Sequence, residues 1–351
     1  MAKERQATLY RQYRPRSFAE VRGQGQVTET LEKAIKNGKV AHAYLFSGSR
    51  GTGKTSVARI LAKALGVSDK DLYEIDAASN TGVDNIRELR EGVQTAPFDS
   101  PYKFYIIDEA HMLSRQAWNA LLKTLEEPPA HVIFVLATTE RDKVPETIQS
   151  RCEVYTFKQP TREVLTQAVN DVAKKEGYSL ERSAAELIAL LAEGSFRDAL
   201  SILQKVLAVS NDKKIDVAEV EEVSGAPRGE LIRQLLSGIA KKDAKLALGA
   251  IRKAVEQNLD ARTLAKLLIH RMRVVLLMRY APDLADEFSK EVSEDDAKLA
   301  KEISKERGVN SETLRTLLEA YSTMAYAAVP HLPLELAVID ICADKKDAAA
   351  G

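Results

Sequence analysis

Apolar runs alternate with amphipathic stretches along the first 160 or so residues of the chain. Four runs, HAYLFSG, LYEIDA, KFYIIDE and HVIFVLATTE, are typical of buried strands. Three stretches between them predict helices, namely TSVARILAKALG, VDNIRELREGV with a cap near Asn80 or Thr81, and SRQAWNALLKTLEEPP. Strands that alternate with helices predict an α/β fold with a parallel sheet, whose ligands bind at the carboxyl ends of the strands.

The pattern changes near residue 160, where the strand signals end. Three or four short helices are expected up to VEEVSG, and the Gly and Pro of SGAPRGE, around residues 224–230, predict a linker. Longer amphipathic helices follow in ELIRQLLSGI, DAKLALGAIRKAVEQ and TLAKLLIHRMRVVLLMRYA. We therefore predict a nucleotide-binding α/β domain at residues 1–160, a small helical domain at 161–224, a larger helical domain at 225–342 and a disordered tail at 343–351.

Composition and charge narrow the class of protein. The 351 residues are 45% apolar and 29% charged, as in ordinary globular proteins, and the formal net charge is zero. A nucleic-acid surface must therefore be local, and the basic arm KERQATLYRQYRPR is either such a surface or a solvated tail. No run reaches the roughly 18 apolar residues of a membrane helix. The only two cysteines, Cys152 and Cys342, lie far apart, which excludes a disulfide framework and fits a reducing cytoplasm.

The segment GSRGTGKT, from Gly48 to Thr55, fits the phosphate-binding pattern G-x-x-x-x-G-K-[ST] at every fixed position. A strand pattern precedes it and a helix pattern follows, as this motif requires. Lys54 is expected to reach the β- and γ-phosphates of a nucleotide, and Thr55 to place its hydroxyl on Mg²⁺. Backbone N–H groups of the loop would surround the phosphates, from Gly48, Ser49, Arg50, Gly51, Thr52 and Gly53.

Polar residues end the next two apolar strands. Asp108 can hold Mg²⁺ through water, and the adjacent Glu109 can orient or deprotonate an attacking water, although an acidic pair can also cap a helix. His111 completes a DEAH tetrad and is interpreted as a local packing or capping residue. Thr138 and Thr139 would lie near the γ-phosphate, but any strand end can carry two threonines.

Two arginines are candidates for contact with the phosphates. Arg151, in PETIQSRC, follows a short helix, where a cation complements the helix dipole. Arg197, in GSFRDAL, lies at a helix start, where a cation is unfavourable. An arginine directed at a γ-phosphate would explain that placement.

The motifs YRP, GQ, GSRGTGKT, IDEAHMLS, NALLKTLEEPP, ATT, SRC and GSFRDAL occur in this order. Together they closely resemble the gamma/tau ATPase subunits of the bacterial DNA polymerase III clamp loader, over roughly residues 8–342. The resemblance implies an AAA+ module with an α/β domain and a helical lid. It also implies a helical collar that joins five subunits into an open ring, with ATP at each subunit boundary.

The resemblance also assigns roles to residues. Those acting on the subunit's own ATP would be Lys54, Thr55, Asp108, Glu109, Arg197 and Thr139, with Thr138 as the alternative sensor. Arg151 would act in trans as an arginine finger, and the N-terminal arm would cover the adenine with Arg11, Tyr13, Arg14 and Pro15. ATP would open a sliding clamp on primed DNA and hydrolysis would release it. The DNA would be held by its phosphates, with Arg115 and the helix start near Thr81 as contacts.

The sequence departs from the family pattern at two places. The four-cysteine zinc module usual after the phosphate-loop helix is absent from ALGVSDKDLYEIDAASN, so no zinc site is expected. Arg22, in VRGQ, stands where an apolar residue near the base is usual.

Two other functions remain open. An AAA+ branch-migration motor would share the phosphate loop, but often ends in a winged DNA-binding domain, whereas the region after residue 230 predicts helices only. A nucleotide-binding scaffold that scarcely hydrolyses ATP is disfavoured by the presence of Glu109.

Overall fold

The computed structural model describes residues 8–79, 89, 91–210, 212–285, 289, 292–306 and 308–343. The chain divides into two compact units, Met1–Val169 with Ala192–Ser201 and Asn170–Leu191 with Ile202–Gly351. The helix predicted over residues 83–93 lies largely outside the described residues, and so does its start near Asn80 and Thr81. The predicted boundaries at residues 160 and 224 stay a prediction.

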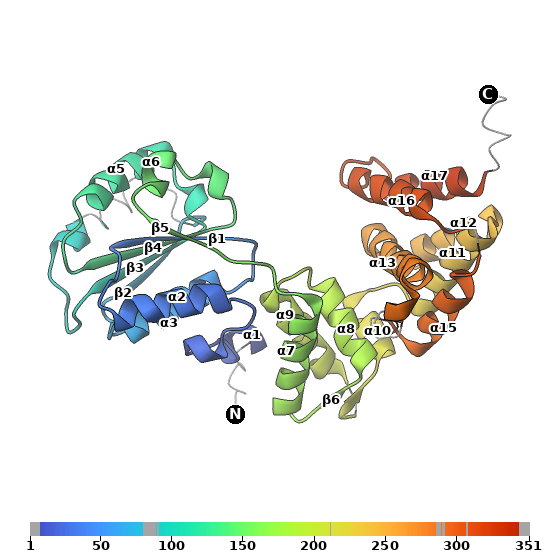
Figure 1. The fold of residues 1–351 in the computed structure, drawn as a ribbon, viewed down its shortest axis with the longest axis horizontal. Coiled ribbons are helices and arrows are strands. Elements are labelled where there is room, and N and C mark those ends of the chain that lie inside the picture. The colour runs from blue at the N-terminus through green and yellow to red at the C-terminus, as the bar shows by residue number, and fades with distance from the viewer. Residues whose placement is uncertain are drawn as a thin grey trace. The chain divides into compact units, whose positions relative to one another are not determined.

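A five-stranded parallel sheet forms the centre of the first unit, in the order β2-β3-β4-β1-β5 (Figure 1). Its strands are β1 (Ala43–Ser47), β2 (Leu72–Asp76), β3 (Lys103–Asp108), β4 (Val132–Thr138) and β5 (Glu153–Thr156). The parallel sheet confirms the predicted α/β class, and β1 to β4 coincide with the four predicted strands. The edge strand β5 is not predicted, because its four residues are at most half-buried and give no apolar run.

Helices cover both faces of this sheet (Figure 1). Helices α2 (Gly25–Lys36) and α3 (Lys54–Ala64) lie on one face, and α5 (Arg115–Glu126) and α6 (Glu146–Gln149) on the other. Side chains alternate along β1, so that Tyr44 and Phe46 join the core under α2 and α3 while Leu45 joins Trp118 under α5. Burial on both faces explains the continuous apolar runs in the sequence.

Shorter elements complete the first unit. Neither α1 nor α2 was predicted from the sequence, although α2 buries Val27 and Leu31 against the sheet. The short elements are α1 (Leu9–Gln12) and the 3₁₀ turns η1 (Phe18–Glu20), η2 (Ala110–Met112) and η3 (Arg141–Lys143).

Helices dominate the remainder of the chain. They are α7 (Arg162–Lys175), α8 (Arg182–Leu191), α9 (Phe196–Val209), α10 (Val217–Ser224), α11 (Gly229–Lys241), α12 (Ala244–Glu256), α13 (Ala261–Tyr280), η4 (Pro282–Leu284), α15 (Glu294–Ile303), α16 (Ser311–Thr323) and α17 (Leu332–Cys342). The expectation that strands end near residue 160 is wrong at one point, because β6 (Ser179–Leu180) pairs with β7 (Lys214–Ile215). Two residues are too few to give an alternating pattern. Among the described residues, no helix is both long and apolar enough to span a membrane.

A buried carboxylate fixes the connection between α3 and β2, where the resembled family usually carries its zinc module. Asp71 is fully buried. Its Oδ1 accepts a hydrogen bond from the backbone N–H of Phe98 at 2.6 Å, and its Oδ2 accepts from those of Asp99 and Ser100 at 3.0 Å. Burial alone would raise the pKa of Asp71, but these N–H donors lower it from 3.8 to about 2. The ionised carboxylate therefore joins two loops at the edge of the sheet.

The lowered pKa of Asp71 predicts how stability depends on pH. The contribution of the carboxylate is fully present above its unfolded pKa near 3.8 and is lost as the pH falls towards its folded pKa of about 2. An amide cannot accept all three bonds at any pH. Asp71→Asn should therefore lower Tm at pH 7, and the gap to wild type should narrow between pH 4 and pH 2. A gap independent of pH would contradict this account, and Asp69→Asn, at an exposed position in the same loop, is the control.

Candidate nucleotide-binding site

The phosphate loop leaves the carboxyl end of β1 and enters α3. Gly48, Gly51 and Gly53 have φ values of 146°, 72° and 102°, which favour glycine. A Cβ added to Gly48 would overlap the carbonyl oxygen of Phe157, and one added to Gly51 would overlap the Ser195 hydroxyl. The loop backbone is thus packed against two distant segments of the first unit, which leaves no room for a side chain at Gly48 or Gly51.

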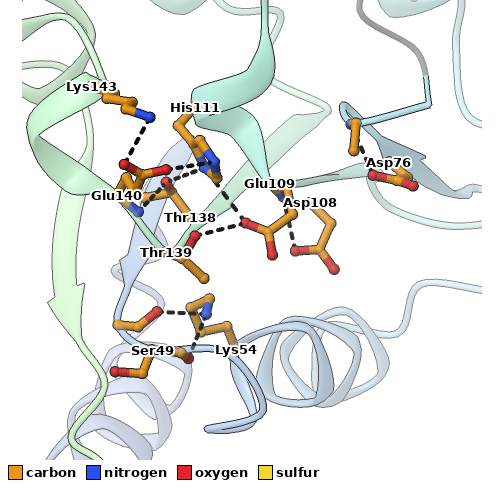
Figure 2. A network of polar contacts seen from close by, with 12 residues as sticks. Ser49, Lys54, Asp76, Asp108, Glu109, His111, Thr138, Thr139, Glu140 and Lys143 are labelled. Carbon is orange, nitrogen blue, oxygen red and sulfur yellow. Dashed lines mark hydrogen bonds and ion pairs between the residues drawn. The ribbon is translucent and has the colours of Figure 1, made fainter. Parts of the chain in front are cut away.

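Lys54, the first residue of α3, points its ammonium group into the loop (Figure 2). Its Nζ donates to the carbonyl oxygens of Gly48 at 2.7 Å and Ser49 at 2.9 Å, and the residue is only 6% exposed. Burial lowers the pKa of Lys54, while the charges of Glu109 and Asp108 act to raise it. The site thus holds a buried cation close to two carboxylates, at the positive end of a helix.

One hydrogen bond joins the loop to the carboxylates that follow β3. Thr55 Oγ1 donates to Asp108 Oδ2 at 2.8 Å. Hydroxyl, carboxylate and water oxygens are the ligands that Mg²⁺ prefers, so this pair fits a magnesium ion. Within the described part of the chain, no three His, Cys, Asp or Glu side chains are grouped to hold a metal. A cation beside Thr55 and Asp108 would therefore take its other ligands from phosphate and water.

Glu109 has a left-handed backbone, with φ 48° and ψ 44°. A residue with a side chain adopts this conformation at a cost, and such strain is typical of functional sites. Its Oε2 accepts a hydrogen bond from Thr139 Oγ1 at 3.1 Å (Figure 2). Thr138 is fully buried and lies 3.0 Å from His111 Nδ1 instead. Of the two threonines, the structure therefore places Thr139 beside Glu109.

His111 has more polar contacts than a packing residue needs. Besides Thr138, its Nδ1 lies 3.5 Å from Glu109 Oε2, and its Nε2 lies 3.2 Å from Glu140 Oε1. Glu140 in turn pairs with Lys143 at 2.8 Å. The sequence signals this network only through the DEAH tetrad, which contains Glu109 and His111. Thr138 and Glu140 lie far along the chain, on β4 and in the turn that follows it.

Arg197 lies in the first turn of α9, which packs against the phosphate loop. The N–H of Phe196 donates to the carbonyl oxygen of Gly51 at 3.0 Å. The Arg197 guanidinium carbon lies 5.0 Å from the ring centroid of Tyr10, a cation–π contact that the sequence analysis missed. Arg11 lies 5.8 Å from the same ring.

For the remaining predicted residues, the structure gives exposure or contacts away from the phosphate loop. Tyr13 and Pro15 are half-buried, and their role at the adenine stays a prediction. Arg22 and Arg115 are exposed. Arg151 donates to Thr147 O and Glu126 Oε1, each at 2.7 Å. Because these partners belong to α6 and α5, this arginine is not held against the phosphate loop.

Comparison with known proteins identifies the family. The sequence model of the DNA polymerase III delta subunit family matches residues 23–74 and 66–161, and that of the DNA polymerase III clamp loader subunit ATPase lid domain matches residues 164–212. DNA polymerase III subunit tau of Bacillus subtilis (strain 168) is 39% identical over 367 residues, covering 97% of this chain and 64% of that protein. The chain belongs to the DNA polymerase III gamma/tau family. This confirms the resemblance found in the motifs.

Two further comparisons show how much of each relative this chain covers. DNA polymerase III subunit tau of Escherichia coli (strain K12) is 39% identical over 293 residues, covering 77% of this chain and 45% of that protein. This gamma/tau-family chain therefore spans less than two thirds of the length of these relatives. The Thermotoga maritima RuvB Holliday junction branch migration motor superposes with a TM-score of 0.52 at 24% identity, covering 65% of this chain and 79% of that one. This likeness shows the AAA+ fold alone.

The packing of the loop predicts the effect of filling Gly51. In Gly51→Ala the new Cβ overlaps Ser195, and an L-residue at φ 72° adds strain of about 1–2 kcal/mol. We expect a Tm lowered by several degrees and an affinity for ATP reduced at least about tenfold, measured by titration calorimetry. Gly249→Ala is the matched control, because no atom lies within 4 Å of its added Cβ inside α12, and it should preserve or raise Tm. Unchanged ATP affinity in Gly51→Ala would contradict the packing argument.

Proposed function

We propose that this chain is the ATP-hydrolysing subunit of a bacterial replicative clamp loader. It uses ATP binding to open a sliding clamp on primed DNA, and hydrolysis to release the clamp. The observation that carries the proposal is the meeting of Lys54, the Thr55–Asp108 pair and the Glu109–Thr139 pair at one edge of the sheet. Membership of the gamma/tau family supports the same function.

The loop and its lysine bind the triphosphate. Lys54 would exchange the carbonyl oxygens of Gly48 and Ser49 for β- and γ-phosphate oxygens. Backbone N–H groups from Gly48 to Gly53, with the N-terminus of α3, supply the remaining donors. Thr55 and Asp108 would hold Mg²⁺, which neutralises charge on the phosphates.

Glu109 acts on the attacking water. Thr139 holds Oε2 of this carboxylate, so that the group has a fixed orientation at the end of β3. Glu109 accepts a proton from the water as its oxygen bonds to the γ-phosphorus, and the bond from that phosphorus to the β,γ-bridging oxygen breaks. The products are ADP and inorganic phosphate.

Two arginines would complete the site, one from the same chain and one from a neighbouring subunit. Arg197 lies in the first turn of α9, which packs on Gly51, and this placement suits contact with the chain's own γ-phosphate. Arg151 is one-third exposed and held by α5 and α6, which suits a finger that reaches a neighbouring subunit's ATP. An arginine finger supplied in trans is worth about 10³–10⁵ in rate. This division makes hydrolysis depend on assembly.

The C-terminal helices carry a surface suited to that assembly. Leu332, Leu336 and Ile339 recur at helical spacing on α17 and are 43%, 51% and 44% exposed. An exposed apolar stripe of this kind is typical of an interface between subunits. We assign it to the collar of a five-subunit ring, formed with the other clamp-loader subunits.

The fold after residue 228 also favours a clamp loader over a branch-migration motor. The described residues from Gly229 onward form helices and turns, with no strand of a winged domain. We place the ring in the cytoplasm, in keeping with two free cysteines. Primed DNA would be held through its phosphates, with exposed Arg115 as one contact.

ATP turnover with different DNAs tests the proposed function. We expect primer–template DNA to stimulate the assembled ring more than blunt duplex or a four-way junction, and the sliding clamp to increase this stimulation. Glu109→Gln should bind ATP with unchanged affinity while kcat falls about 10²–10⁴-fold, because the proton acceptor is lost. Stimulation chiefly by the four-way junction, regardless of the clamp, would favour a branch-migration motor. Absence of turnover in the wild type would favour a scaffold.

The exposed apolar stripe on α17 predicts that charged substitutions there weaken assembly of the ring. Leu336→Asp combined with Ile339→Asp would place two charges in a buried interface, and should weaken assembly at least about tenfold. Sedimentation velocity would show smaller species, while ATP affinity and Tm of the single chain stay close to wild type. Asp340→Ser is the control, since this exposed residue on the same helix is already polar. Unchanged sedimentation of the double variant would remove α17 from the interface.

A further inference from the structure

His111 lies at the centre of the polar network beside Glu109 (Figure 2). Its side chain is 7% exposed, and it is enclosed by Glu109, Thr138 and Glu140. These neighbours come from three places, which are the end of β3, the last residue of β4 and the turn after β4. A ring that only filled space would not need a polar partner at both nitrogens.

The donors and acceptors fix the orientation of the ring. The ionised Glu140 carboxylate can only accept, so the Nε2 atom 3.2 Å away carries the hydrogen and donates to it. The Glu140 N–H donates to Thr138 Oγ1 at 3.0 Å. Thr138 is thereby held in place 3.0 Å from His111 Nδ1. A hydrogen bond from Lys143 lowers the pKa of Glu140 and keeps this carboxylate charged. The imidazole ring therefore has a polar partner at each of its two nitrogens.

Glu109 needs such support, because its backbone is strained. A left-handed φ of 48° persists only where the surroundings hold it. Thr139 bonds Oε2 at 3.1 Å, and His111 Nδ1 lies 3.5 Å from the same oxygen. No described residue hydrogen-bonds Oε1, so this oxygen is the one left to take a proton from water.

We infer that His111 is a positioning residue for Glu109. With Nε2 as the donor, Nδ1 is an acceptor and makes no hydrogen bond to Oε2. The edge of the ring instead keeps Oε2 on the side of Thr139, so that Oε1 faces the attacking water, and the Glu140–Lys143 pair holds the imidazole in that position. This inference rests on the proposed function, since it concerns the hydrolytic step. It differs from the interpretation of His111 as a packing residue because it predicts a loss in kcat rather than in stability or ATP affinity.

Three substitutions at His111 separate its two ring nitrogens. The full chain, assembled with its partner subunits, is assayed for kcat and for the affinity of a slowly hydrolysed ATP analogue, with Tm measured for each variant. His111→Ala should lower kcat about ten- to a hundredfold, part of the effect of a general base, and change analogue affinity less than twofold. His111→Asn retains a polar atom near Nδ1 and should recover much of the rate. His111→Gln retains one only near Nε2 and should resemble His111→Ala.

The combined variant and a control make the test specific. Adding His111→Ala to Glu109→Gln should cost no further rate, because the residue to be positioned is already lost. His42→Ala, a histidine change at an exposed position, should match the wild type. Wild-type kcat in His111→Ala, a parallel loss of analogue affinity, or a further loss in the combined variant would each overturn the inference alone. Absence of turnover in the wild type would overturn the proposed function, and this inference with it.

Discussion

The hydrogen bond from Thr55 to Asp108 joins the two halves of the candidate site, and the remaining geometry depends on it. Thr55 belongs to the helix that follows β1, and Asp108 ends β3, with β4 lying between the two strands. A parallel sheet brings the carboxyl ends of its strands to one edge, so Ser47, Asp108 and Thr138 end together. The phosphate loop is then held next to the carboxylates without any long connecting segment.

Around that bond the charged groups have polar partners, and Lys54 is also buried. Lys54 is satisfied by loop carbonyls and faces two carboxylates. Glu109 is strained but is held by Thr139 and lies beside His111. Arg151, by contrast, is bound to Glu126 and Thr147, away from the loop. The chain therefore groups most of its candidate residues at one site and holds Arg151 away from it, which suits the ring proposed above.

The sequence predicts those parts of this arrangement that arise from local pattern. Four strands are recognisable because both of their faces are buried, and the loop because glycine and lysine occur at fixed spacing. The edge strand β5 was missed, since one neighbour and partial exposure leave little apolar signal. The family resemblance favoured Thr139 over Thr138, but its bond to Glu109, the contact of Arg197 with Tyr10 and the contacts of His111 were beyond prediction. Each joins residues far apart in sequence, and is fixed only once the sheet has formed.

The most direct test of this account mixes two inactive forms of the chain. Lys54→Ala removes nucleotide binding but leaves Arg151 in place, and Arg151→Ala does the reverse. If Arg151 serves the neighbouring subunit, rings assembled from both forms contain some boundaries with an intact site and an intact arginine. The account predicts that ATP turnover, nearly absent in either form alone, reappears in the mixture. A mixture as inactive as its two components would contradict it and would place Arg151 in its own subunit's site.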